Sequence, residues 1–261
     1  MKVSNAVLME AALEVARTAS LVAMRYYKRD LAVETKGDGS PVTLADRAAE
    51  QLAREWIHAR FPADAILGEE FGETPGSSNR RWLLDPIDGT KSFVRGVPLW
   101  GTCVAVVEGE EVVAGAAAYP AVDEYIAAAP GEGCWHNDAR CRVSDVVTLA
   151  DATVLCTDDR NFPSPDRRAG WDRLSLAAGV SRGWGDCYGY LLVATGRAEV
   201  MVDPILNPWD APPFLPIIEE AGGVFTGWTG ARDAFAGDAI ATNAKLAKVA
   251  RELLASAPHH S

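Results

Sequence analysis

The stretch from Trp82 to Thr90 constrains this chain most, because an apolar run in it ends in two aspartates three residues apart, Asp85 and Asp88. The run Trp82–Leu84 predicts a buried strand, so both aspartates lie near the strand's end. Pro86 fixes its own φ and favours an extended backbone at the residue before it, which keeps this turn stiff. Two carboxylates on a stiff turn are oxygen ligands of the kind that Mg²⁺ prefers. An Asp-Pro turn with solvated acids is the alternative interpretation.

Gly89 and Thr90 follow the two aspartates directly. A glycine lets a ligand approach the backbone closely, and the amides of both residues could face an anion if a helix begins here. We therefore expect a metal ion and an anionic ligand to meet at the end of this strand.

Composition and charge restrict the class of protein. The chain has 261 residues, of which 48% are hydrophobic, so it is long enough to bury a substantial core as one large domain or two small ones. Its net charge of −11 argues against nonspecific binding to nucleic acid or to an anionic membrane surface. No stretch of the sequence is long and apolar enough to cross a bilayer. An acidic protein that handles phosphates needs cations as intermediaries.

The cysteines and the N-terminus bear on the cellular compartment. The five cysteines contain no C-x-x-C pair, and their odd number leaves one unpaired in any disulfide scheme. The N-terminal segment lacks the uninterrupted apolar run of a signal peptide, because Glu10, Glu14 and Arg17 interrupt its apolar residues. Both observations favour a reducing cytoplasm.

Hydrophobic periodicity predicts a mixture of helices and strands. Helices are expected over about 4–29, 44–60 and 171–178. A further apolar helix is expected to end at Ala194, and another to run from Trp209 to Glu220, with Pro216 kinking or shortening it. Strands are expected at 65–67, 82–84, 102–107, 112–119, 124–129, 154–155 and 200–202. The segment 36–43 is rich in turn formers and predicts a mobile loop, which carries Lys36 and Asp38.

Three motifs taken together resemble the inositol monophosphatase superfamily of metal-dependent phosphatases. The family signature W-x-x-D-P-I-D-G-T is met by Trp82–Thr90, the G-E-E element by Gly68–Glu70, and the later W-D motif by Trp209 and Asp210. The resemblance runs from the first helix to Asn243, nearly the full chain. It implies an α+β fold, a layered α-β-α-β-α sandwich with two mixed sheets, usually assembled as a homodimer.

The resemblance also implies a set of metal ligands. Two Mg²⁺ ions are expected in each subunit, and a third, weaker ion rests mainly on Glu69, completed by the loop of Lys36 and Asp38. Taken alone, each acid is an ordinary surface acid or helix cap, which is the alternative for Asp210 in particular. The ligands of the first ion are Glu69, Asp85 and the carbonyl of Ile87, and those of the second are Asp85, Asp88 and Asp210.

Thr90 and Asp46 match the catalytic dyad of the family. The resemblance implies that the Thr90 hydroxyl and Glu69 orient a metal-activated water for in-line attack on phosphorus, without a covalent intermediate. Without the resemblance, the favoured interpretation of Asp46 is a surface acid of a helix, paired with Arg47 or Arg54.

Substrate specificity is expected in the second half of the chain. The phosphate would face Asp88, Gly89 and Thr90, whereas the family's other substrate-facing positions correspond to Gly185, Asp186, Cys187 and Asp203. Inositol enzymes usually carry a small neutral residue where this chain has Asp186. A second carboxylate beside Asp203 favours a cationic substrate tail over a neutral polyol. Capping of the following helix is the alternative role of Asp186.

Two further runs, 92–102 and 185–190, resemble the histidinol-phosphate phosphatase branch of the superfamily. This branch releases phosphate from L-histidinol phosphate in histidine synthesis. An inositol-1-phosphatase or a broad small-molecule phosphatase is the alternative, and a catalytically silent relative that only binds partners is disfavoured because every inferred metal ligand is present. Arg182, Trp100 and Tyr188 are candidates for contact with the imidazole.

The pattern of elements restarts near Ala152 and suggests a division near residue 145. The N-terminal α+β half, residues 1–145, would carry most metal ligands. The C-terminal α/β half, residues 146–261, would carry the specificity residues and the last metal ligand.

Overall fold

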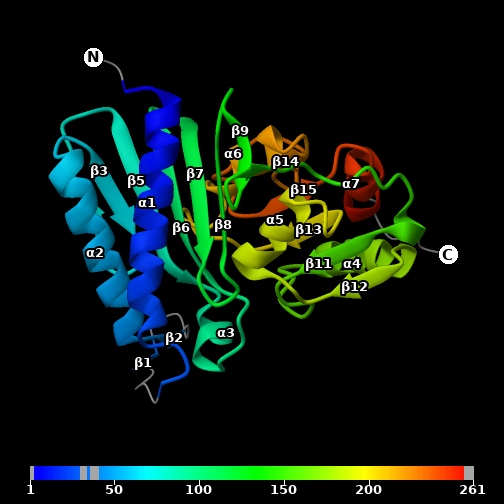
Figure 1. Ribbon diagram of the computed structural model, residues 1–261. Helices are drawn as coiled ribbons and strands as arrows, with labels where there is room; N and C mark the ends of the chain where they lie inside the picture. Colours follow the sequence, from blue (N-terminus) through cyan, green and yellow to red (C-terminus); the bar gives the residue numbers. More distant parts are fainter. Residues whose placement is uncertain (1–2, 30–33, 36–40, 256–261) are drawn as a thin grey trace.

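The computed structural model describes residues 3–29, 34–35 and 41–255, and its elements stack in five layers (Figure 1). The expected loop residues Lys36 and Asp38 lie outside the described residues. The arrangement is the α-β-α-β-α sandwich with two mixed sheets that the resemblance implies. The helical layers are, in order, α1 (Asn5–Met24) with α2 (Leu44–Arg60), then α5 (Asp186–Ala194) with α6 (Phe214–Glu220), then α4 (Pro165–Ala177) with α7 (Ala247–Ala255).

The larger sheet separates the first two helical layers, and the only parallel pair among its described strands is β3 with β5. Because parallel strands end at the same edge of a sheet, the residues after β3 lie beside the end of β5. In sheet order the strands are β10 (Ala139–Arg140), β9 (Gly133–His136), β8 (Glu124–Ala129), β7 (Glu111–Tyr119), β6 (Gly101–Glu108), β5 (Arg80–Asp88), β3 (Ala65–Gly68) and β4 (Gly72–Thr74).

The smaller sheet lies between the second and third helical layers. Its strands β12, β11 and β13 run parallel, whereas β15 pairs antiparallel with both β13 and β14. In sheet order they are β12 (Val180–Arg182), β11 (Thr153–Cys156), β13 (Val200–Asp203), β15 (Ala239–Thr242) and β14 (Val224–Thr226). The remaining elements are the strand pair β1 (Glu34–Thr35) and β2 (Pro41–Val42), the short helix α3 (Thr90–Val94) and a 3₁₀ turn, η1 (Leu149–Asp151).

Alternation along β5 divides the core between the two faces of the large sheet. Trp82 and Leu84 pack under α1 and α2, whereas Leu83 joins the core between the sheets, as the period of two in a strand requires. A third core covers the outer face of the small sheet under α4 and α7. The middle core joins Leu83 to Tyr190 and Phe214, so it draws on both sides of residue 145, and the division predicted there stays a prediction.

Three helices differ from the sequence expectation. α1 ends at Met24, and the left-handed backbone of Lys28 (φ 59°) rules out a helix that continues to residue 29. α4 begins earlier than expected, at Pro165, behind an N-cap hydroxyl from Ser164. The expected helix from Trp209 begins only at Phe214, so Pro216 lies in its first turn. No helix among the described residues is long and apolar enough for a membrane span.

Candidate active site

Four of the predicted metal ligands meet at the carboxyl end of β3 and β5. Glu69 follows β3, and its backbone N–H donates to the carbonyl of Leu84 at 3.1 Å. Asp85 and Asp88 lie in the last four residues of β5, and Asp210 reaches the same place from the loop before α6. The acids line a cavity of about 350 Å³, together with Ile87, Gly89 and Thr90.

The end of β5 is shaped by its sequence. Pro86 has no N–H for the sheet, and pairing with β6 shifts register between Asp85 and Asp88. The backbone N–H of Ile87 donates to Asp85 Oδ1 at 3.0 Å, which fixes that carboxylate. Gly89 then turns the chain with a φ of 90°, and a Cβ there would come within 2.9 Å of the Leu99 carbonyl. Only glycine suits this position.

Glu50 of α2 holds the loop that carries Glu69. Its carboxylate is buried and accepts the backbone N–H of Glu70 at 2.7 Å and that of Phe71 at 3.2 Å. Arg54 donates to the same carboxylate at 2.7 Å. Glu50 therefore positions Glu69 from outside the cavity. The sequence does not single it out, because it resembles any acid on an amphipathic helix.

The acids repel one another in a buried place. Burial is the largest cause that raises the pKa of Asp85 well above its usual value, followed by the charges of Glu69, Asp88 and Asp210. Burial likewise raises the pKa of Asp88 well above its usual value and that of Asp210 to about 7, although the backbone N–H of Asn207 donates to Asp210 at 2.7 Å. Such a cluster is stabilised when cations share its charge.

The donor set fits magnesium. It offers hard carboxylate oxygens together with the carbonyl of Ile87, in a cavity that is open to small ligands. Asp85 is only 3% exposed. The largest charge effects on its pKa come from other acids, those of Glu69, Asp88 and Asp210, so a bound metal ion would supply a counter-charge to the cluster.

The two residues of the predicted dyad make different hydrogen bonds. The Thr90 hydroxyl donates to the carbonyl of Ile87 at 2.9 Å, so its proton is not directed at Asp46. Asp46 is buried at the start of α2, where its Oδ2 accepts the N–H of Thr43 at 2.8 Å and its hydroxyl at 2.7 Å, forming a capping box. Burial raises the pKa of Asp46, and the charge of Glu69 adds to the rise.

The predicted specificity residues come from the small sheet and α5. Thr157 follows β11 and links two of them, because its hydroxyl donates to Asp203 Oδ1 at 2.5 Å and accepts the N–H of Asp186 at 2.8 Å. The other oxygen of Asp203 accepts the Tyr190 hydroxyl at 2.9 Å. A Cβ on Gly185 would overlap the Thr157 backbone, so only glycine permits this approach.

Asp203 and Asp186 differ in accessibility. Asp203 is 3% exposed with both oxygens hydrogen-bonded, whereas Asp186 is half-buried and lines both the large cavity and an adjoining one of about 80 Å³. The Asp186 carboxylate also lies beside Gly89, where a Cβ would be 3.3 Å from its Oδ2. Asp186 therefore faces the space next to the expected phosphate position, and Asp203 lies behind it.

The backbone of Asp186 is unusual. Gly185 is the N-cap of α5, no side-chain cap hydrogen bond is formed, and Asp186 has a left-handed φ of 50° at the first helical position. The capping role that the sequence left open for Asp186 is therefore not the one observed. Left-handed backbone at a residue other than glycine is a form of local strain that often accompanies a functional site.

Cys187 and the imidazole candidates lie elsewhere. Cys187 is fully buried, and its thiol contacts the Asp88 carbonyl at 3.6 Å from behind the cavity. Trp100 is also fully buried and packs edge-on against Phe93. The Tyr188 hydroxyl donates to Glu124 at 3.3 Å, and Arg182 is an exposed residue of β12. None of the three imidazole candidates lines either cavity.

Two charged residues of the cavities escaped the sequence analysis. Lys91, in α3, lines both cavities, and its charge opposes the burial that raises the pKa of Asp186 to about 6. Asp158 also lines both cavities and keeps a lowered pKa, chiefly through the backbone N–H of Arg160. Lys91 directly follows the D-G-T motif and could have been noticed there. Asp158 lies just after the short strand β11, where no sequence motif marks it.

A buried cluster of acids beside a glycine turn, at the ends of two parallel strands, defines a site suited to phosphate esters and divalent cations. The model of the inositol monophosphatase family matches residues 4–260 of the chain. The chain is 42% identical over 233 residues to a histidinol-phosphatase of Chlorobaculum parvum, with 89% of this chain and 90% of the relative covered. A histidinol-phosphatase of Mycobacterium tuberculosis is 35% identical over 88% of this chain and 90% of its own length.

Solved structures agree with these relatives. The extragenic suppressor protein suhB of Bartonella henselae superposes with a TM-score of 0.88 at 27% identity, over 95% of this chain and 98% of its own. An inositol monophosphatase of Thermotoga maritima gives a TM-score of 0.84 at 28% identity, over 95% and 96%. The chain belongs to the inositol monophosphatase family. It is a phosphoric monoester hydrolase.

Proposed function

We propose that this protein is a Mg²⁺-dependent phosphatase that hydrolyses L-histidinol phosphate to L-histidinol and phosphate, a step of histidine synthesis. The observation that carries the proposal is the carboxylate of Asp186, held in a left-handed backbone at the edge of the cavity beside Gly89. Histidinol phosphate carries an ammonium group near its phosphate ester, and a carboxylate beside the expected phosphate position is a suitable partner for that ammonium group. Relatives named histidinol-phosphatase support this choice.

The metal ions would be held by Glu69, Asp85, Asp88, Asp210 and the Ile87 carbonyl, two or three in each subunit. When bound, Mg²⁺ neutralises the phosphate, lowers the pKa of a water and stabilises the leaving alkoxide. The side chains of the chain then position the reactants. The Thr90 hydroxyl donates its hydrogen bond to the Ile87 carbonyl, so its oxygen has lone pairs to accept a hydrogen bond from the attacking water. Glu69 accepts a second hydrogen bond from that water, and together Thr90 and Glu69 align the water with phosphorus.

The rest of the site would hold the substrate by its two ends. The backbone of Gly89 and Thr90 faces the phosphate, and Lys91 adds a positive charge on the same side. Asp186 would bind the ammonium group, and Asp203 supports it through the shared hydroxyl of Thr157. Asp46, at the start of α2, would influence the site through the repulsion between its charge and that of Glu69. The homodimer and the cytoplasmic location stay predictions.

Inositol-1-phosphatase activity, alone or within a broad specificity, is the second candidate. It is favoured by relatives such as the fructose-1,6-bisphosphatase/inositol-1-monophosphatase of Aquifex aeolicus, which is 32% identical over 82% of this chain. A neutral polyol would leave the charge of Asp186 poorly matched. The two candidates therefore differ in what they require of this one side chain.

The test is phosphate release by the purified protein from each ester, with excess Mg²⁺ and with chelator. The proposal predicts a kcat/KM for histidinol phosphate at least tenfold above that for inositol 1-phosphate, and loss of both activities with chelator. An equal or reversed preference would retain the phosphatase and reject the substrate. Release that persists in chelator would reject the metal dependence.

A further inference from the structure

The β9–β10 hairpin at the edge of the large sheet brings two cysteines face to face. Its two-residue turn, Asn137 and Asp138, has left-handed backbone at both positions (φ 45° and 64°), as tight hairpins prefer. With Ala139 opposite His136, the register places Cys141 opposite Cys134. The backbone N–H of Cys141 donates to the carbonyl of Cys134 at 3.1 Å, which continues the pairing. Neither cysteine lines the cavities of the candidate active site.

The two thiols are in direct contact. Their Sγ atoms are 3.3 Å apart, compared with about 2.05 Å in a disulfide. Opposed residues at a hydrogen-bonded position of an antiparallel pair have Cα atoms about 5.5 Å apart, within the range that disulfides span. Closing the bond therefore needs rotation of the side chains and little movement of the strands.

The two cysteines differ in environment. Cys134 is fully buried, whereas Cys141 is partly exposed. The thiol of Cys134 can donate a hydrogen bond to an ionised Cys141, and this contact lowers the pKa of Cys141 below its ordinary value while it raises that of Cys134. The positive charge of Arg197 contributes in the same direction for Cys141. Cys141 is the thiol that a reagent from solvent can reach, so it is the nucleophile of the pair, and Cys134 is the partner behind it.

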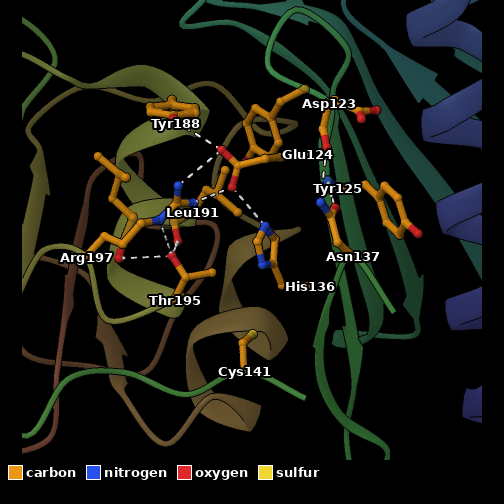
Figure 2. Close-up of polar contacts among 12 residues, drawn as sticks. Asp123, Glu124, Tyr125, His136, Asn137, Cys141, Tyr188, Leu191, Thr195 and Arg197 are labelled. Atoms are coloured by element: carbon orange, nitrogen blue, oxygen red, sulfur yellow. Dashed lines mark hydrogen bonds and ion pairs between the residues drawn. The ribbon is translucent and has the colours of Figure 1, made fainter. Parts of the chain in front are cut away.

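Arg197 is held in place by a polar network (Figure 2). Two of its nitrogens donate to the carboxylate of Glu124 at 2.6 and 3.1 Å, and its Nε donates to the Thr195 hydroxyl at 2.8 Å. The ring of His136 contacts the same carboxylate at 2.8 Å. The network therefore fixes the guanidinium group whose charge helps to lower the pKa of Cys141, and Cys141 itself stays partly exposed.

The other three cysteines lack this combination. Cys103, Cys156 and Cys187 are all buried. Burial raises the pKa of Cys156 to about 12 and that of Cys187 well above its usual value, so neither forms a thiolate readily. Contact with a second thiol occurs for Cys187 and Cys103 too, but both are fully buried behind Asp88.

We propose that Cys141 and Cys134 are a peroxide-sensitive thiol pair that closes a reversible disulfide across the β9–β10 hairpin. The Cys141 thiolate attacks one oxygen of hydrogen peroxide; the S–O bond forms, the O–O bond breaks, and the departing hydroxide takes up a proton as water. Cys134 sulfur then attacks Cys141 Sγ; the S–S bond forms, the S–O bond breaks, and hydroxide leaves with the proton of Cys134 as a second water. Two thiols are oxidised and one peroxide is reduced to two waters.

The experiment treats the reduced 261-residue chain with a small excess of hydrogen peroxide, blocks the remaining thiols by alkylation, and locates modified cysteines by tandem mass spectrometry. Arg140 lies between the two cysteines, so trypsin cleavage there leaves fragments that stay joined only by the disulfide. The expected result is loss of two hydrogens in the intact mass, a Cys134–Cys141 link, and full recovery with dithiothreitol. The other three cysteines should be alkylated as in untreated protein.

Three variants separate a built pair from general oxidation. Cys134→Ala should stop at a sulfenic acid on Cys141 that dimedone traps, Cys141→Ser should leave Cys134 reduced, and the matched control Cys156→Ser should behave like the wild type. Thermal melting of each variant checks that the fold is retained. Oxidation of all five cysteines at similar rates, or of Cys134 in the Cys141→Ser variant, would overturn the proposal. So would the absence of the link in the folded wild type.

Discussion

Replacing Asp186 with Asn tests the substrate assignment with the smallest change to the site. Asn keeps the shape of the side chain and tolerates the left-handed backbone (φ 50°), whereas a β-branched residue such as Thr would be strained there. The N–H of the residue still donates to Thr157, so Gly185 and α5 keep their place. The substitution removes one negative charge and little else.

The size of the effect follows from the position of this carboxylate. A hydrogen bond to a charged group contributes about 1.5–3 kcal/mol. Because Asp186 is only half-buried, solvent screening favours the lower part of this range, about 1.5–2 kcal/mol, or roughly 10- to 30-fold in kcat/KM. Inositol 1-phosphate has no cation to lose, so its kcat/KM should stay within about threefold of the wild type.

The assay is steady-state phosphate release from both esters at pH 8, with excess Mg²⁺ and with both enzymes at matched concentration. Burial raises the pKa of Asp186 to about 6, and at pH 8 the wild-type side chain is therefore ionised. A loss of the predicted size for histidinol phosphate alone would support the ammonium contact. Equal losses for the two esters would refute the reasoning, because they would make Asp186 a structural residue.

The remaining predictions concern metal binding and stability. Asp85→Asn should abolish turnover, and substantial residual activity would contradict the ligand assignment. Because the substitution removes a buried carboxylate whose pKa is raised, the melting temperature without Mg²⁺ should be unchanged or higher. Added Mg²⁺ should stabilise the wild type but not the variant. Glu50→Gln should weaken the hold on the loop that carries Glu69, so we expect half-maximal activity to need a roughly 10- to 100-fold higher Mg²⁺ concentration. An unchanged Mg²⁺ requirement would argue against this role of Glu50. Burial alone would raise the pKa of Asp64, but its hydrogen bonds, led by that of Arg80, lower it, so Asp64→Asn should cost about 3 kcal/mol in urea unfolding at pH 7. Since the folded pKa is lowered, this difference should be complete above about pH 4 and shrink as the pH falls below it; a difference that does not change with pH would rule out the ion pair as its cause.

Local patterns in the sequence predict much of the framework. α2 has the bounds that its apolar stripe indicates, because Thr43 caps its start and Phe61 ends it. The hairpin of β6 and β7 follows from two apolar runs around a glycine turn, and the end of β5 from its proline and two aspartates. In each case residues close in sequence determine the conformation.

What the sequence could not indicate depends on contacts between distant segments. Glu50 supports a loop twenty residues away, and Thr157 joins Asp186 to Asp203 across two elements. The left-handed backbone of Asp186 directly follows the close approach of Gly185 to Thr157, a contact that no local pattern indicates. The later start of α6 has a local cause instead, because the Asn207 N–H donates to Asp210 Oδ2 and a turn therefore precedes the helix.

The most direct test of the proposed function is an internal competition. Histidinol phosphate and inositol 1-phosphate are supplied together at equal concentration with excess Mg²⁺, and the disappearance of each ester is followed by mass spectrometry, so that the ratio of rates equals the ratio of their kcat/KM values. The account predicts that histidinol phosphate is consumed at least tenfold faster, and that chelator stops both reactions. Consumption of the two esters at the same rate, or of inositol 1-phosphate first, would contradict it.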